Sequence, residues 1–222
     1  YFSSLAPDKV IAGLEKAYAA AQSAGLLDEA PQAAKVIGVN IVPIALYEPW
    51  GEIVQCWGNV IQISEDFVTG AIPQDQIQPK LTHMFMHYVL NTWDPRPPTA
   101  GILNRPEPWT WLDEAIATWS ERIFDQTYIP NQALQNADFL IKHGLEYPTH
   151  LLDSATPARN HGYGASMFAE YLIEWCCGRT PRVRDPISRM MDVRSLLRSR
   201  AAGTTTEFQY LPVQALPLLR SF

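Results

Sequence analysis

The chain has 222 residues, of which 47% are hydrophobic and 18% charged, and 17 basic against 23 acidic side chains give a net charge of −6. This composition excludes intrinsically disordered, collagen-like and coiled-coil proteins, and the acidic balance indicates no nucleic-acid partner. No apolar run reaches the roughly 18 residues of a membrane helix, so no membrane span is expected. Because the sequence opens at Tyr1 rather than Met, we expect a processed chain or part of a longer one.

The first third of the sequence predicts one helix followed by short strands. Apolar residues recur at helical spacing over residues 8–24, which indicates an amphipathic helix that ends at a glycine. Residues 35–47 are rich in β-branched and apolar side chains, and Pro43 within them favours an edge strand or a bulge. Two further runs, 52–55 and 60–64, are separated by a Gly-Asn pair that is typical of a turn. We therefore predict two or three strands of a small sheet.

From Pro73 onward the sequence is predominantly helical. The predicted helices are residues 74–93, 109–124, 131–143, 162–177 and 186–201. The loop 94–108 between the first two holds five prolines, so it is expected to be stiff and irregular. A sheet followed by helices indicates an α+β fold with a small mixed or antiparallel sheet. We predict a single domain with an N-terminal helix and sheet subdomain (1–72), a helical subdomain (73–202) and an extended tail (203–222).

The three cysteines leave the redox compartment open. Cys56, Cys176 and Cys177 form no CxxC pair, so a cysteine zinc site is not supported. In an oxidising compartment Cys56 can pair with one of the two vicinal cysteines. Three buried thiols in a reducing compartment fit the sequence equally well.

The C-terminal third carries the one basic stretch of this acidic chain. Seven arginines lie between residues 179 and 200. A solvated helix face is the simpler interpretation. The alternative is a docking surface for other domains of a longer chain.

Two histidines in the helix predicted over 74–93 are the first chemically informative feature. His83 and His87 are four residues apart, so their side chains project from one helix face and can bind one metal ion. In the next predicted helix, Glu114 lies on an otherwise apolar face, where a carboxylate is costly unless it is paired or bound to a metal. Two imidazoles, one carboxylate and an open position form the catalytic zinc arrangement. The alternative is a pair of core histidines that form a salt bridge to Glu114.

In these motifs the chain resembles the gluzincin metallopeptidases, the group that contains thermolysin and aminopeptidase N. Their HExxH helix precedes a second helix with an (N/D)Ex(x)A segment, and the resemblance implies that His83, His87 and Glu114 bind Zn²⁺. Asp113 stands where these families often have Asn, and Glu121 recurs seven residues after the ligand. The resemblance also implies a zincin-like fold, a peptide or protein substrate, and a secreted or cell-envelope location.

The same resemblance suggests roles for residues around the metal. Residues 58–64 resemble the strand that flanks the substrate cleft above the histidine helix and offers an edge to an extended peptide. Tyr163 or His161 would stabilise the transition state at the reacting carbonyl, whereas packing is the plainer role for both side chains. Asp113, Thr118 and Glu121 are expected to contact the ligands on the side away from the metal and to hold them in position.

One residue departs from the gluzincin motif. Met84 follows the first histidine, where these peptidases have the glutamate that accepts a proton from the attacking water and passes it to the leaving amine. A thioether cannot perform this step, and we expect neither Asp113 nor Glu121 to replace it. Peptide hydrolysis is therefore expected to be weak or absent. The alternative is a non-catalytic pseudo-peptidase that binds a peptide or protein partner, or a structural module of a larger protein.

Overall fold

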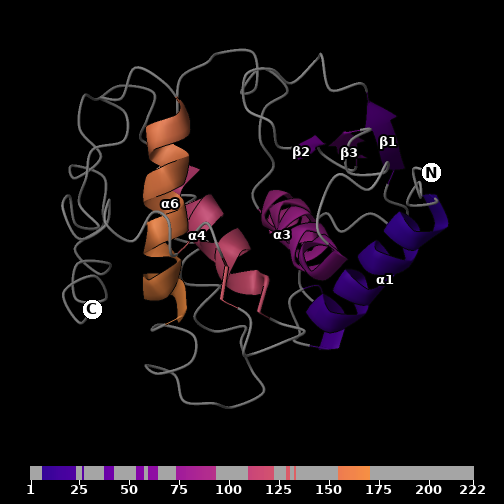
Figure 1. The fold of residues 1–222 in the computed structure, drawn as a ribbon, viewed down its shortest axis with the longest axis horizontal. Helices are drawn as coiled ribbons and strands as arrows, with labels where there is room; N and C mark the ends of the chain where they lie inside the picture. The colour runs from indigo at the N-terminus through magenta and orange to yellow at the C-terminus, as the bar shows by residue number, and fades with distance from the viewer. Residues whose placement is uncertain are drawn as a thin grey trace. The chain divides into compact units, whose positions relative to one another are not determined.

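The computed structural model of the 222-residue chain shows a helix, three short strands and then further helices (Figure 1). It describes residues 7–23, 27, 38–42, 54–57, 60–64, 74–93, 110–122, 129, 130, 133 and 155–170. These residues are mostly helical and include one small mixed sheet, so the predicted order of a sheet followed by helices is confirmed for them. The predicted loop 94–108, the helix 186–201, the arginine-rich stretch and the tail lie outside the described residues. Of the helix predicted over 131–143, only Ala133 is described, and it is helical.

Helix α1 (Pro7–Ser23) confirms the helix predicted over residues 8–24. Its buried side chains are spaced three or four residues apart, as expected of an amphipathic helix, and they are Val10, Leu14, Ala17 and Ala21. This face packs on a second helix, α3 (Gln74–Trp93), where Gln78 Nε2 donates a hydrogen bond to the carbonyl oxygen of Gly13 at 3.0 Å. The rings of Tyr18 and Phe85 meet edge to face, with their centroids 5.9 Å apart. Helix α1 is thus fixed against the helix that carries both histidines.

The sheet has three strands in the order β1-β3-β2. Strand β1 (Gly38–Val42) runs parallel to β3 (Val60–Ser64), and β2 (Val54–Trp57) runs antiparallel to β3. Ile61 and Ile63 of β3 have no exposed surface and share one face of the sheet because side chains alternate along a strand. Within this sheet β1 is an edge strand that ends directly before Pro43, as the proline predicted.

The position of β3 corrects one expectation from the sequence. Residues 58–64 were expected to offer an exposed edge to an extended peptide, but β3 pairs with β1 on one side and with β2 on the other. Its backbone hydrogen-bonding groups are therefore used within the sheet. Strand order was not available from the sequence, because it depends on which strands pair rather than on their order along the chain.

Helix α3 runs from Gln74 to Trp93, as predicted, and contacts α1, β2 and β3. It tolerates Pro79 within its second turn. Two of its threonine hydroxyls donate to backbone carbonyls of the preceding turn, Thr82 to Gln78 at 2.9 Å and Thr92 to Val89 at 2.6 Å. Among the described helices, none combines the length and the apolarity that crossing a membrane requires.

Two further helices follow, and their ends differ from the predicted ones. Helix α4 spans Thr110–Ser120, so the helix predicted over 109–124 ends earlier, in a turn at Glu121 and Arg122. Helix α6 spans Ala155–Glu170 and begins seven residues before the predicted start at Gly162, while residues 171–177 lie outside the described part. The glycine suggested a helix boundary. It lies instead inside α6, where another backbone approaches closely.

The chain divides into two compact units. The first comprises residues 1–98 and 120–126, and in it α1 and the sheet pack on α3. The second comprises residues 99–119 and 127–222, and in it α6 packs on the segment from Trp111 to Glu114 of α4. The predicted division at residues 72, 202 and 203 stays a prediction.

Candidate metal centre

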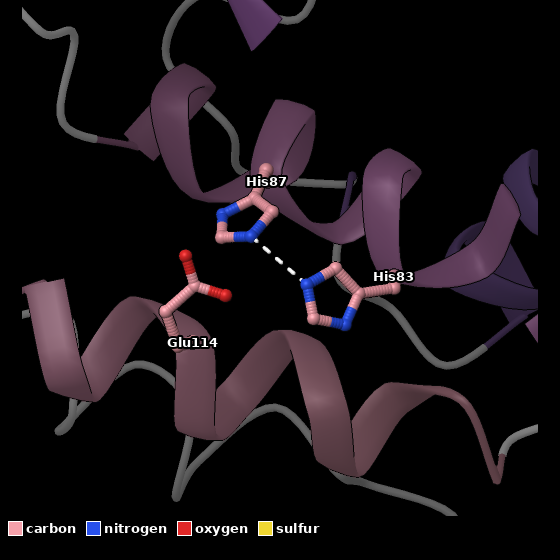
Figure 2. Close-up of side chains that lie close together, drawn as sticks. All are labelled: His83, His87 and Glu114. Carbon is pink, nitrogen blue, oxygen red and sulfur yellow. Dashed lines mark hydrogen bonds between the residues drawn. The ribbon is translucent and has the colours of Figure 1, made fainter. Parts of the chain in front are cut away.

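His83 and His87 face each other across one turn of α3 (Figure 2). Their Nε2 atoms are 3.2 Å apart, and their ring centroids are 5.0 Å apart with the ring planes at 64°. The i, i+4 spacing produces this arrangement, because residues four apart on a helix lie on one face. Two ring nitrogens are therefore directed at the same small volume.

A carboxylate fixes the orientation of the first histidine. Nδ1 of His83 lies 2.8 Å from Oε1 of Glu121, and the two side chains are 10% and 3% exposed. A carboxylate accepts hydrogen bonds, so Nδ1 of His83 is the donor, and in the neutral ring Nε2 carries the lone pair. This is the arrangement of metal-binding histidines, whose second ring nitrogen donates to a carboxylate. Glu121 thus holds the ring of His83 in the orientation that this hydrogen bond defines.

Glu114 supplies the third group. One ligand atom from each of His83, His87 and Glu114 lies within 4.8 Å of the others, and Figure 2 shows the carboxylate directed toward the two rings. Glu114 is 9% exposed and is carried by α4. The described residues therefore contain a group of two imidazoles and one carboxylate that can hold a metal ion.

The separation of the two histidine nitrogens fits a metal ion without rearrangement of the rings. Two ligands at 2.0–2.1 Å in a tetrahedral shell lie about 3.3 Å apart. The observed distance between the Nε2 atoms is 3.2 Å. In the absence of a metal, this short distance requires one nitrogen to donate to the other, and the lone pair on His83 assigns the donor to His87.

The other residues predicted for the site lie on α3, α4 and α6. Met84 follows His83 on α3 and is half-buried. Asp113 and Thr118 of α4 have no exposed surface. On α6, the ring of His161 is fully buried and packs on Trp111 with centroids 5.6 Å apart, whereas Tyr163 is half-buried. The roles expected for these residues stay predictions.

Gly162 is a residue of this region that sequence reasoning missed. A Cβ atom at this position would lie 2.5 Å from Cβ of Glu114, 2.6 Å from the carbonyl oxygen of Trp111 and 3.0 Å from its Cα. The backbone of α6 therefore lies directly against the segment of α4 that carries the carboxylate. The available signal was a glycine in the interior of a helical pattern, which often marks such an approach.

Comparisons with protein-family models, with curated proteins and with solved structures found no match.

Proposed function

We propose that this chain is a gluzincin-like domain that binds one Zn²⁺ ion through His83, His87 and Glu114. The observation that carries the proposal is the pair of Nε2 atoms 3.2 Å apart, one of them oriented by Glu121 through Nδ1. Two histidines that serve only in core packing do not need a carboxylate at Nδ1 of one ring and a second carboxylate close to both rings.

The donor set favours zinc among the divalent metals. Imidazole suits zinc and other transition metals, whereas calcium and magnesium prefer shells made only of oxygen ligands. Three protein ligands with an open fourth position are typical of catalytic zinc sites, and structural sites use four. The described residues offer three such ligands.

The chemistry of the site follows from the residues beside it. A bound zinc ion would act as a Lewis acid that polarises a carbonyl oxygen. Glu114 and the two histidines would hold the ion. Glu121 would hold the ring of His83 in the orientation that directs Nε2 toward it. Met84 offers no proton acceptor, so the site binds a peptide carbonyl without efficient hydrolysis of the amide bond.

A second candidate function is binding without catalysis. Met84 is the observation that favours it, because a half-buried thioether occupies the position of the base in the related motif. In this version the domain recognises a peptide or protein partner and retains the metal only to orient it.

Removal of a ligand is expected to abolish zinc binding. The purified chain should hold about one zinc ion, and His87→Gln and Glu114→Gln should each weaken the affinity for zinc by at least about 100-fold. Both replacements keep the side chain close to its original volume, so the loss would reflect the lost ligand rather than a cavity. Zinc content is measured by inductively coupled plasma mass spectrometry, and affinity by competition with a chromogenic chelator.

Glu15→Gln is the matched control, because Glu15 is an exposed glutamate on α1. It should keep the zinc content and affinity of the unaltered chain. Equal zinc affinity in Glu114→Gln and Glu15→Gln would contradict the proposed ligand set. A chain that takes up no zinc at all would contradict the proposed function.

A further inference from the structure

The hydroxyl of Thr118 differs from the hydroxyls of two threonines of α3. Thr82 and Thr92 of α3 both donate to a backbone carbonyl of the preceding turn, as threonines in helices commonly do. Thr118 has no exposed surface, and within the described part of the chain its Oγ1 has no hydrogen-bond partner. A buried hydroxyl without a partner is unfavourable, so we expect another state of the protein in which a partner is available to it.

The position of Thr118 along α4 identifies that partner. Thr118 is four residues after Glu114 and three before Glu121. At about 100° per residue, position 118 lies about 40° from position 114, so the two share one face of α4. Glu114 belongs to the metal-ligand group. Thr118 therefore lies on the side of α4 that carries the ligating carboxylate.

A carboxylate that ligates a metal can accept further hydrogen bonds. A carboxylate that binds a metal through one oxygen leaves its second oxygen with lone pairs to satisfy, and ligating carboxylates are regularly hydrogen-bonded. Side chains four residues apart on a helix are neighbours. Thr118 therefore offers a hydroxyl proton within one turn of Glu114.

We propose that Thr118 is a positioning residue that donates a hydrogen bond to the non-ligating oxygen of Glu114 when the metal is bound. This inference rests on the proposed function, since it assigns the orientation of one of the three ligands. The hydroxyl keeps Glu114 bound through a single oxygen, which leaves the fourth position of the metal open. Without a metal the hydroxyl has no partner among the described residues, and this lowers the stability of the fold.

The proposal predicts opposite effects of one substitution on two measurements. Thr118→Val keeps the shape of the side chain and removes the hydroxyl, so it should raise the melting temperature of the metal-free chain. The same variant should bind zinc about 10–100-fold more weakly, because the ligating carboxylate loses its donor. Thr118→Ser keeps the hydroxyl and should retain zinc affinity close to that of the unaltered chain.

The experiment measures the melting temperature of the metal-free proteins and their zinc affinity by chelator competition. X-ray absorption at the zinc edge adds a structural readout, and it should show one more oxygen neighbour in Thr118→Val, as Glu114 turns to bind through both oxygens. Equal zinc affinity in Thr118→Val and the unaltered chain would overturn the proposal. So would a loss in Thr118→Ser as large as in Thr118→Val, since packing rather than the hydroxyl would then matter.

The two proposals fail in different ways. Absence of zinc from the unaltered chain would overturn the proposed function together with this inference. Normal zinc binding by the unaltered chain that Thr118→Val does not weaken would overturn the role of Thr118 alone. If Thr118→Val does not fold, the comparison of Thr118→Ser with the unaltered chain decides the matter, and lost affinity in Thr118→Ser contradicts the proposal.

Discussion

Met84→Glu is expected to raise the zinc-dependent peptide hydrolysis of this chain by about 10²–10⁴-fold, the range that a positioned general base contributes. Met84 directly follows the proposed ligand His83 and is half-buried, so a carboxylate there keeps contact with water. Methionine and glutamate are similar in length, and α3 tolerates both. The measurement is the turnover of a peptide library by the zinc-loaded proteins, with and without a chelator.

Met167→Glu is the matched control for this substitution. Met167 is exposed on α6, so the same exchange there adds the same charge without adding a base at the proposed site. It should leave turnover unchanged. If the unaltered chain cleaves peptides as fast as Met84→Glu, and zinc removal stops both, the base lies elsewhere and the proposed account of the missing glutamate is wrong.

Gly162→Ala is expected to destabilise the protein and to weaken zinc binding together. The added Cβ would lie 2.5 Å from Cβ of Glu114 and 2.6 Å from the carbonyl oxygen of Trp111, and a backbone oxygen cannot turn away. Alanine is more favourable than glycine in a helix by about 1 kcal/mol, whereas overpacking costs about 1–3 kcal/mol. We expect overpacking to prevail, and the displaced Glu114 to lower the affinity for zinc by about 10-fold or more.

Gly13→Ala separates the steric effect from the helical preference. Gly13 also lies inside a helix, but the nearest atoms to its added Cβ belong to the ends of the side chains of Leu81 and Gln78. These ends can rotate, so the cost should be smaller and zinc affinity should be unchanged. Chemical denaturation and chelator competition measure both quantities. Equal losses of stability and of zinc affinity in the two variants would contradict the role assigned to Gly162.

Local patterns were enough to predict the elements that carry the ligands. The apolar periodicity and the flanking prolines gave the full extent of α3, and the alternation of β-branched residues gave β3. The helical spacing of His83 and His87 predicted that their rings share a face. Each of these features depends on residues a few positions apart, and such short-range geometry is the same in any fold.

Helix ends were less predictable where the chain environment overrides local preference. Gly162 is unfavourable in an isolated helix, and so it suggested the start of α6. The structure continues α6 through it, because only a residue without a side chain fits against Trp111 and Glu114. The end of α4 at Ser120 likewise leaves Glu121 in a turn, where it still reaches His83.

The sequence by itself determined which residues can bind a metal, and it placed the two histidines one turn apart on one helix. Only the tertiary structure decided which partners they meet, because 38 residues separate His83 from Glu121 and spacing along the chain does not specify such contacts. It also decided that β3 is the central strand, since pairing depends on all three strands at once. The missing partner of Thr118 became visible in the same way: burial and hydrogen bonding are properties of the folded chain, and a threonine in a helical pattern carries no sign of either.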